Sequence, residues 1–241
     1  MQNIKQALAE LLGTFFFVLL GAGSIVISSH MGASGAGLIG IAIAHGLALS
    51  IAISATMNVS GGHINPAVTV GLIVIGKETV PAGALKIAGQ LIGATIAGFL
   101  LKGLLPAEAV LASGLGTPAP GAGLSLGTVF FLEVIATFLL AFAIYGTAAA
   151  KRAPVGLGGF GIGLTLAAVI FTFGPLTGAA LNPARWFGPA LASGQLSTLW
   201  VYFLGPIVGA TLGLLVSRCA LEECCGGKGC CCAKNEGTPS A

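Results

Sequence analysis

Long apolar runs, separated by glycine, proline and charged residues, dominate the pattern of this 241-residue chain. A helix needs about 20 apolar residues to cross the hydrocarbon core of a bilayer. Two shorter apolar stretches, at 66–75 and 183–192, would span only about 15 Å as helix, so they predict half-helices that enter the membrane without crossing it. The pattern predicts six crossings, at 7–29, 36–57, 82–105, 124–149, 156–174 and 198–218.

The two half-helices belong to two copies of one pattern. Ala9–Phe15 resembles Leu132–Phe138, and the triplet that begins at Asn65 recurs at Asn182. Three crossings separate the copies, and an odd number reverses the direction through the membrane, so the half-helices enter from opposite faces. Inverted repeats place their shared site near the midplane. We therefore expect an all-α membrane protein with six transmembrane helices plus two half-helices in two inverted repeats, at about 5–105 and 124–218.

Composition supports a membrane protein and suggests its orientation. With 56% hydrophobic residues, 7% charged residues and a mean hydropathy of +1.01, the chain cannot cover a soluble globule with polar surface. The net charge of +3 then reflects how basic residues are distributed across the membrane, and no nucleic-acid partner is expected. By the positive-inside rule both termini are cytoplasmic. We expect the membrane to be the cell membrane. Lys5, Lys77, Lys86, Lys151, Arg152, Arg218, Lys228 and Lys234 fall on one side, and Lys102 falls opposite.

A cysteine-rich tail follows the last crossing. All six cysteines lie between Cys219 and Cys232, so residues 1–218 are expected to form the membrane domain and residues 219–241 a cytoplasmic tail. Soft-metal binding and acylation are two interpretations of these cysteines. Because the tail has no histidine and no standard zinc spacing, a reduced, disordered tail is favoured, and neither a metal site nor a cofactor is expected.

Each Asn-Pro-Ala triplet carries specific helix-start chemistry. Proline suits the first position of a helix, where its missing N–H costs nothing, and asparagine then becomes the N-cap whose side-chain oxygen accepts a backbone N–H. Each amide NH₂ is then oriented toward the lumen, and both half-helices present partial positive charge at the midplane. Cations and protons meet a barrier there. A lone triplet would be a turn signal, but two copies before half-length apolar segments predict a pore formed by Asn65, Pro66, Ala67, Asn182, Pro183 and Ala184.

The segments Ser60–Thr69 and Asn182–Arg185 resemble the two signatures of the aquaporin, or major intrinsic protein, family. The resemblance covers roughly residues 5–218 and implies a passive water channel, assembled as a homotetramer in the lipid bilayer. Glu10 and Glu133 match the glutamates that brace the pore loops in this family. A proton path is the alternative interpretation of buried glutamates, and their symmetric placement favours bracing. His63 is expected to tie down its own loop.

The family's constriction lies at fixed offsets from the two asparagines, and the resemblance assigns it to His45, Ile170, Ala179 and Arg185. Strict water channels of the family have Phe in place of His45 and His in place of Ile170. The combination here resembles plant tonoplast-type aquaporins, which implies a wider filter that also admits ammonia or other small neutral solutes. Donors from His45 and Arg185 would meet the nitrogen lone pair of ammonia.

A membrane enzyme, a glycerol or small-solute facilitator and a non-conducting membrane protein are alternatives to a water channel. A membrane enzyme would need clustered acid, base or metal ligands, and the pattern predicts none. Glycerol facilitators of the family have Asp directly after the motif arginine, where this chain has Trp186, which fits neither branch. Tyr202 and Phe203 resemble the aromatic pair of the water-selective branch. A glycerol or small-solute facilitator, and a non-conducting structural membrane protein on the same fold, remain as alternatives.

Overall fold

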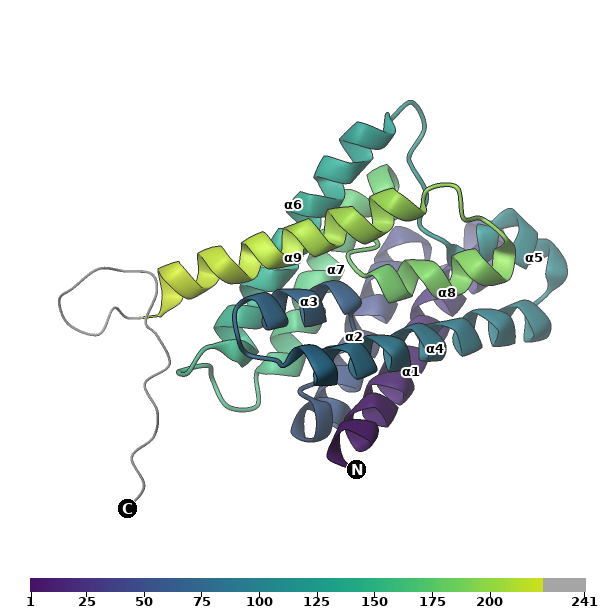
Figure 1. The fold of residues 1–241 in the computed structure, drawn as a ribbon. Helices are drawn as coiled ribbons and strands as arrows, with labels where there is room; N and C mark the ends of the chain where they lie inside the picture. The colour runs from purple at the N-terminus through teal and green to yellow at the C-terminus, as the bar shows by residue number, and fades with distance from the viewer. Residues whose placement is uncertain (223–241) are drawn as a thin grey trace, which may run out of the picture.

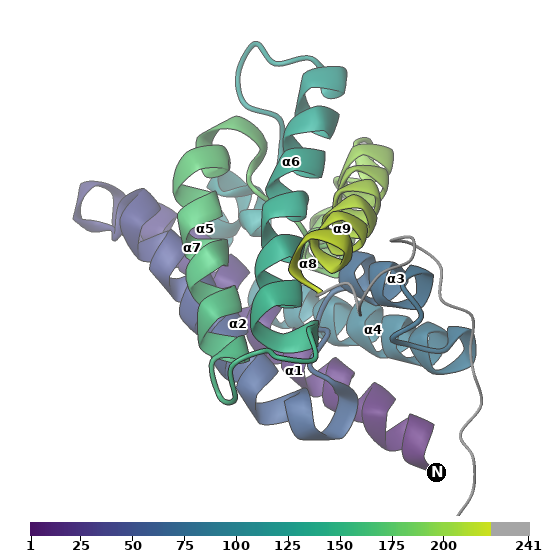
Figure 2. The ribbon, with the colours of Figure 1, turned by 90° about the vertical axis from the view of Figure 1, so that its left-hand side faces the viewer.

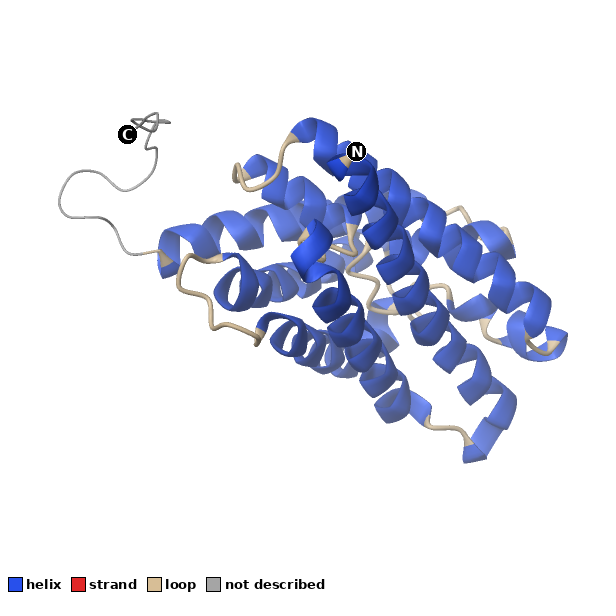
Figure 3. Ribbon diagram, turned by 90° about the horizontal axis from the view of Figure 1, so that it is seen from below, coloured by secondary structure: helices blue, strands red, loops and turns tan. Residues whose placement is uncertain are grey.

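The computed structural model describes residues 1–222, and within that range every regular element is helical (Figure 3). Six of the described helices are long and apolar enough to span a membrane, which confirms the predicted number of crossings. The expectation of a disordered tail from Cys219 is wrong for its first residues, because the last long helix continues to Leu221. From residue 223 onward that expectation lies outside the described residues. The six long helices are α1 (Gln2–Met31), α2 (Gly37–Ser60), α4 (Val80–Leu104), α6 (Leu126–Ile144), α7 (Gly158–Thr177) and α9 (Leu199–Leu221).

The two half-helices lie inside the bundle. Helix α3 (Pro66–Val74) and helix α8 (Pro183–Ser193) lie between α9 and α4, and their N-terminal ends face the centre (Figure 1). Each packs mainly against the third crossing of the other repeat, α3 on α9 and α8 on α4. The long helices pair as α1 with α4, α6 with α9 and α2 with α7, and α6 and α7 stand side by side in the second view (Figure 2). Because each half-helix packs on a helix of the other repeat, the two repeats form one unit.

Short elements that the apolar pattern did not predict connect the crossings. Helix α5 (Ala107–Ala112) and the 3₁₀ turn η2 (Gly114–Gly116) lie between α4 and α6, and another 3₁₀ turn, η1 (Gly32–Ser34), follows α1. Helix α6 ends in a single π-helical turn, η3 (Tyr145–Ala149). A single helical turn is too short to produce a periodic apolar signal, which explains why the sequence did not predict these elements.

Glycines let the helix pairs approach closely, as their small-xxx-small spacing predicts. In the α1–α4 pair, a Cβ on Gly89 would lie 2.3 Å from the carbonyl oxygen of Ala7, and a Cβ on Gly93 would lie 2.2 Å from that of Leu11. In the α6–α9 pair, a Cβ on Gly209 would lie 2.3 Å from the carbonyl oxygen of Val134. A side chain at these positions would have to push two backbones apart.

Helix α4 offers a matched test of this packing. Gly93→Ala should destabilise the protein by about 1–3 kcal/mol, because the added methyl group overpacks against the α1 backbone. Gly103 lies on the same helix, and a Cβ there would meet nothing within 4 Å, so Gly103→Ala should be neutral or slightly stabilising. Thermal unfolding of the purified protein in detergent would compare the two variants. Equal midpoints would contradict the close-approach role of Gly93.

Candidate functional site

The two half-helices begin with the same N-cap geometry. The side-chain oxygen of Asn65 accepts the N–H of Ala67 at 2.9 Å, and that of Asn182 accepts the N–H groups of Ala184 at 2.9 Å and Arg185 at 3.2 Å. Both asparagines are extended, with φ of −152° and −149°, and a proline follows each at the first helical position. The triplets therefore start the two short helices in the way their sequence indicates.

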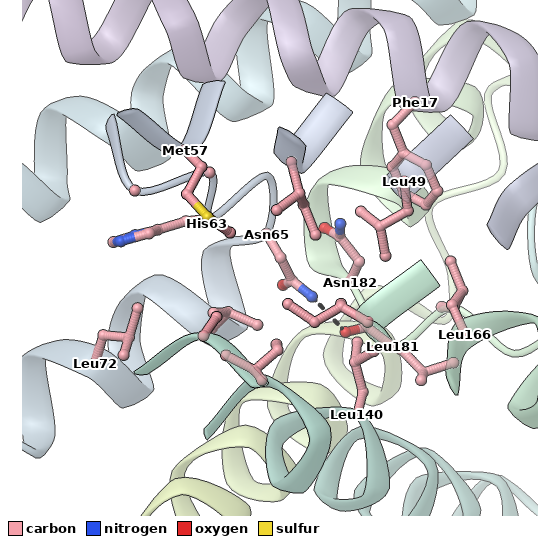
Figure 4. A pocket seen from close by; sticks show the side chains of 18 residues that line it. Phe17, Leu49, Met57, His63, Asn65, Leu72, Leu140, Leu166, Leu181 and Asn182 are labelled. Carbon is pink, nitrogen blue, oxygen red and sulfur yellow. Dashed lines mark hydrogen bonds between the residues drawn. The ribbon is translucent and has the colours of Figure 1, made fainter. Parts of the chain in front are cut away.

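The two asparagines exchange hydrogen bonds across the centre of the bundle. The amide of Asn65 donates to the carbonyl oxygen of Leu181 at 2.9 Å, and the amide of Asn182 donates to that of Ile64 at 2.9 Å. Each acceptor is the residue just before the other asparagine. A side-chain amide carries two N–H donors. Each asparagine uses one of them in this exchange, so its second N–H is not part of the exchange. The close-up shows the first of these bonds as a dashed line (Figure 4).

The residues that accept these bonds adopt an unusual backbone conformation. Ile64 and Leu181 have φ of +54° and +52°, the left-handed region that L-residues seldom adopt and that β-branched residues avoid. Such a conformation costs about 1–3 kcal/mol per residue and persists only where the surroundings enforce it. Here it turns each carbonyl oxygen toward the opposite asparagine, so backbone strain is part of how the site is built.

Glu10 binds the loop before the first half-helix, which contains the strained residue Ile64. Its carboxylate is fully buried and accepts the backbone N–H of His63 at 2.9 Å and of Ile64 at 2.6 Å. It also accepts the hydroxyl of Ser60 at 2.6 Å and the side-chain amide of Gln90 at 2.7 Å. Four donors compensate for the desolvation of one carboxylate, which would otherwise be costly at this depth.

Glu133 holds the second strained loop in the same manner. Its buried carboxylate accepts the backbone N–H of Ala180 at 3.0 Å and of Leu181 at 2.9 Å. The hydroxyl of Thr177 donates to it at 2.6 Å. The two glutamates therefore bind the N–H of the same strained residue whose carbonyl oxygen receives the asparagine bond, so Ile64 and Leu181 are each held by hydrogen bonds at both the N–H and the carbonyl oxygen.

The outer ends of the half-helices meet cations. Lys102, near the end of α4, donates to the carbonyl oxygen of Ala192 in the last turn of α8 at 2.7 Å. Arg218, near the end of α9, donates to that of Ile75, the C-cap of α3, at 2.9 Å. Basic side chains satisfy free carbonyls and oppose the negative end of the helix dipole. Each half-helix thus has its negative end compensated at the surface and its positive end directed at the asparagine pair.

A narrow cavity leads to the asparagine pair from one side. Its volume is about 40 Å³, enough for a few water molecules. Asn65, Asn182 and His63 supply polar groups in a lining that is otherwise mostly apolar (Figure 4). Weak binding by apolar walls and a few donors suits passage of water. The apolar lining includes Phe17, Leu49, Ile53, Met57, Val68, Leu72, Leu140, Ile144, Ile162 and Leu166.

The four predicted filter residues come from four separate segments and lie outside the lining of that cavity. His45 lies on α2, Ile170 on α7, Ala179 in the loop after α7 and Arg185 on α8, and all four are buried. A hydrogen bond joins two of them, since Nε of Arg185 donates to Nε2 of His45 at 3.1 Å. Nη1 of Arg185 has no hydrogen-bond partner among residues 1–222, so it is a buried donor available to a solute.

The partners of His45 fix its tautomer. Nδ1 lies 2.8 Å from the carbonyl oxygen of Ile41, and a carbonyl only accepts, so Nδ1 carries the proton. Nε2 then offers its lone pair to Arg185, and the ring is neutral. Phe17 packs edge-on against the ring at 6.1 Å. The expectation that His45 donates to a passing solute is therefore wrong, because both ring nitrogens are already engaged within the protein.

Two further sequence candidates have clear positions. His63 contacts Thr69, with Nδ1 at 3.1 Å from its hydroxyl, and it also lines the cavity. Trp186, which sequence reasoning could not place, is fully buried and stacks on Tyr202 at 5.5 Å. Trp186 therefore packs within the protein.

Comparison with known proteins agrees with this arrangement. The family model described as "Major intrinsic protein" matches residues 1–217. The chain belongs to the major intrinsic protein family. It is 42% identical over 218 residues to aquaporin TIP4-4 of Zea mays, covering 88% of this chain and 85% of that protein, and 40% identical over 222 residues to aquaporin TIP2-1 of Arabidopsis thaliana, covering 89% and 86%.

A solved structure shares the fold of this major intrinsic protein. The aquaglyceroporin from Plasmodium falciparum superposes with a TM-score of 0.79 at 26% sequence identity, covering 88% of this chain and 94% of that chain. Membership in the family, together with six membrane-length helices in residues 1–222, establishes a multi-pass membrane channel protein. The predicted family and fold class are confirmed, and the protein is not an enzyme.

One buried ion pair in this major intrinsic protein was not predicted. Lys86, which the sequence places among the cytoplasmic basic residues, is buried on α4. Its amino group donates to the carbonyl oxygen of Ser60 at 2.5 Å and to the carboxylate of Glu78. His63 lies 3.9 Å from the same carboxylate. Burial alone would raise the pKa of Glu78, but the hydrogen bonds from Lys86 and from the N–H of Thr79 outweigh it and lower that pKa.

The lowered pKa of Glu78 predicts a pH-dependent effect of Glu78→Gln. Because the folded-state pKa lies below the unfolded value of about 4.3, the pair stabilises the fold above that pH, and its contribution is lost as pH falls through the folded pKa. The variant should unfold more easily than the parent at pH 7, by about 2 kcal/mol, with a smaller difference at acidic pH. Thermal unfolding in detergent at both pH values would measure it, and an equal difference at both would point to packing instead of charge.

Proposed function

We propose that the chain is a passive channel for water that excludes protons and other ions. The observation that carries this proposal is the reciprocal exchange between Asn65 and Asn182, which leaves one N–H of each amide at the point where two half-helix N-termini meet. A water molecule there turns its oxygen toward both donors. Water oriented in this way relays protons poorly, and the converging positive helix ends repel cations, as is general for aquaporin-type pores.

We further propose His45, Ile170, Ala179 and Arg185 as the selectivity constriction. Arg185 supplies the free donor Nη1, while Ile170 supplies an apolar wall. His45 acts through Arg185, because its lone pair accepts from Nε and so orients the guanidinium. Small neutral solutes such as ammonia, which accepts a hydrogen bond much as water does, should meet weak discrimination at such a constriction.

A glycerol facilitator is the second candidate, since the structural relative described above is an aquaglyceroporin. The relatives with higher sequence identity are aquaporins, and the residue after Arg185 is the buried aromatic Trp186. Water is therefore the favoured solute. A non-conducting structural role and an ion-coupled transporter are outcomes of the same flux experiment.

We also propose a domain boundary, an orientation in the membrane and an assembly for this channel. Residues 1–218 form the channel domain, both termini face the cytoplasm, and four copies assemble in the membrane. The basic residues support the orientation. Lys77 contacts the carbonyl oxygen of Ala149 at 2.7 Å and lies 3.9 Å from Glu222, so three of the connections assigned to the cytoplasmic side meet at one end of the bundle. The cell membrane stays a prediction from the sequence, and the homotetramer stays a prediction of the family resemblance.

Osmotic shrinkage of proteoliposomes tests water conduction. Vesicles that contain the purified chain should shrink severalfold faster than empty vesicles under a hypertonic step, and a pH-sensitive dye inside them should report no added proton permeability, because the paired amides and helix ends oppose protons. Equal shrinkage rates would refute the channel. Shrinkage that depends on an ion gradient would favour a coupled transporter, and proton flux through the pore would refute the electrostatic barrier.

Exchanging two filter residues tests the constriction. The double variant His45→Phe with Ile170→His rebuilds the residues of strict water channels at these positions. It should lower the ratio of ammonia to water permeability by a factor on the order of 10, because it replaces the ring that orients Arg185 and inserts a polar group into the apolar wall. Both permeabilities would be measured in the same vesicles. An unchanged ratio would place the constriction elsewhere.

A further inference from the structure

Trp186 makes more specific contacts than core packing requires. It is the residue directly after Arg185, and its side chain is fully buried. Its ring stacks on Tyr202, with centroids 5.5 Å apart and planes 14° from parallel, and meets Phe203 edge-on at 6.2 Å. Its indole N–H donates to the carbonyl oxygen of Pro118 at 3.0 Å. One side chain therefore contacts both α9 and the connection between α4 and α6.

Two of the three partners of Trp186, Tyr202 and Pro118, hold the segment that leads into Ala179. The hydroxyl of Tyr202 donates to the carbonyl oxygen of Thr177 at 2.8 Å. Pro118 lies against Gly178 so closely that a Cβ on this glycine would come within 2.6 Å of the Cα of Pro118. Tyr202 therefore fixes Thr177, and Pro118 fixes Gly178, the two residues that precede Ala179.

Ala179 depends on such support. Its φ is +44°, a left-handed conformation that a non-glycine residue keeps only where its surroundings enforce it. Its N–H donates to the hydroxyl of Thr177 at 3.0 Å, so its position follows that of the preceding residues. A small movement of residues 177–178 would move Ala179 relative to Arg185.

We infer that Trp186 is a positioning residue that sets the width of the constriction. It follows Arg185 on α8 and reaches Ala179 by two routes, the indole N–H to Pro118 and the ring stack on Tyr202. The two sides of the constriction are thereby held at a fixed separation, which limits the passage of neutral solutes larger than ammonia, such as urea. This inference rests on the proposed assignment of Ala179 and Arg185 to the constriction.

The indole nitrogen separates this role from simple packing. Phenylalanine can keep an aromatic ring between Tyr202 and Phe203, but it cannot donate a hydrogen bond, so Trp186→Phe releases the connection that carries Pro118. A packing role predicts some loss of folded protein with no change in selectivity. A positioning role predicts a change in selectivity among the molecules that do fold.

Trp200 provides a matched control for the substitution. It is the other tryptophan of the chain, it is 44% exposed, and it stacks on Phe130 with centroids 5.9 Å apart. Trp200→Phe therefore makes the same chemical change on the same protein, at a site whose ring partner lies on α6 and not in the segment that leads into Ala179. Any general effect of losing an indole should be common to the two variants.

The experiment compares urea and water permeability in the same proteoliposomes. Trp186→Phe should raise the ratio of urea to water permeability by about threefold to tenfold, the factor that the loss of one hydrogen bond supplies, while Trp200→Phe leaves it at the parent value. A ratio that stays at the parent value in Trp186→Phe, or that rises equally in both variants, overturns the inference.

A second variant keeps the test decisive if Trp186→Phe does not fold. Tyr202→Phe keeps the ring stack and removes the hydroxyl that holds Thr177, so it should raise the same ratio, and an unchanged ratio overturns the inference. Failure of the proposed function looks different, because the parent vesicles would then conduct no water, or the exchange at His45 and Ile170 would leave the ammonia ratio unchanged. A parent that passes both tests with a Trp186 variant of unchanged ratio refutes the positioning role alone.

Discussion

The structure depends on the exchange of hydrogen bonds between Asn65 and Asn182 and the carbonyl oxygens of Leu181 and Ile64. This exchange joins the ends of two half-helices from opposite repeats, at a depth where an unpaired backbone oxygen would be expensive. It is possible only because Ile64 and Leu181 adopt a left-handed conformation. The centre of the pore is therefore a strained arrangement, and much of the surrounding structure serves to maintain it.

The fold supports that strain through buried charge and close packing. Glu10 and Glu133 bind the N–H groups of the strained residues, and the carbonyl oxygens of the same residues accept the asparagine bonds. Lys102 and Arg218 bind the outer ends of the half-helices, so compensation of the dipoles occurs at the surface. The positive ends remain uncompensated at the midplane, where they oppose cations. The inverted repeat supplies every one of these contacts twice.

The sequence predicts the parts of this site that depend on spacing. The two triplets and the lengths of the apolar runs indicate the crossings and the half-helices, and the N-caps follow from the residue types. The left-handed conformation of Ile64 has no such signal, because a β-branched residue usually avoids it. Nor could the sequence place Trp186, whose partner Pro118 is 68 residues away, or show that Lys86 forms a buried pair with Glu78. These features depend on tertiary contacts between segments that local patterns do not connect.

The two ends of the proposed pathway discriminate by different means. On the side of the cavity, apolar walls bind water weakly and leave selectivity to the asparagine pair. At the proposed constriction, Arg185 carries a fixed charge, and its neighbour His45 is held neutral by two hydrogen bonds. A protonated His45 would repel Arg185. The neutral ring instead accepts a hydrogen bond from Nε, which orients the guanidinium and leaves Nη1 free. Ion exclusion can then arise from Arg185 and the helix ends. The largest solute that passes is set by the width of the constriction, which depends on the loop that carries Ala179. Separating the two functions in this way allows the width to vary between relatives without loss of the barrier to ions.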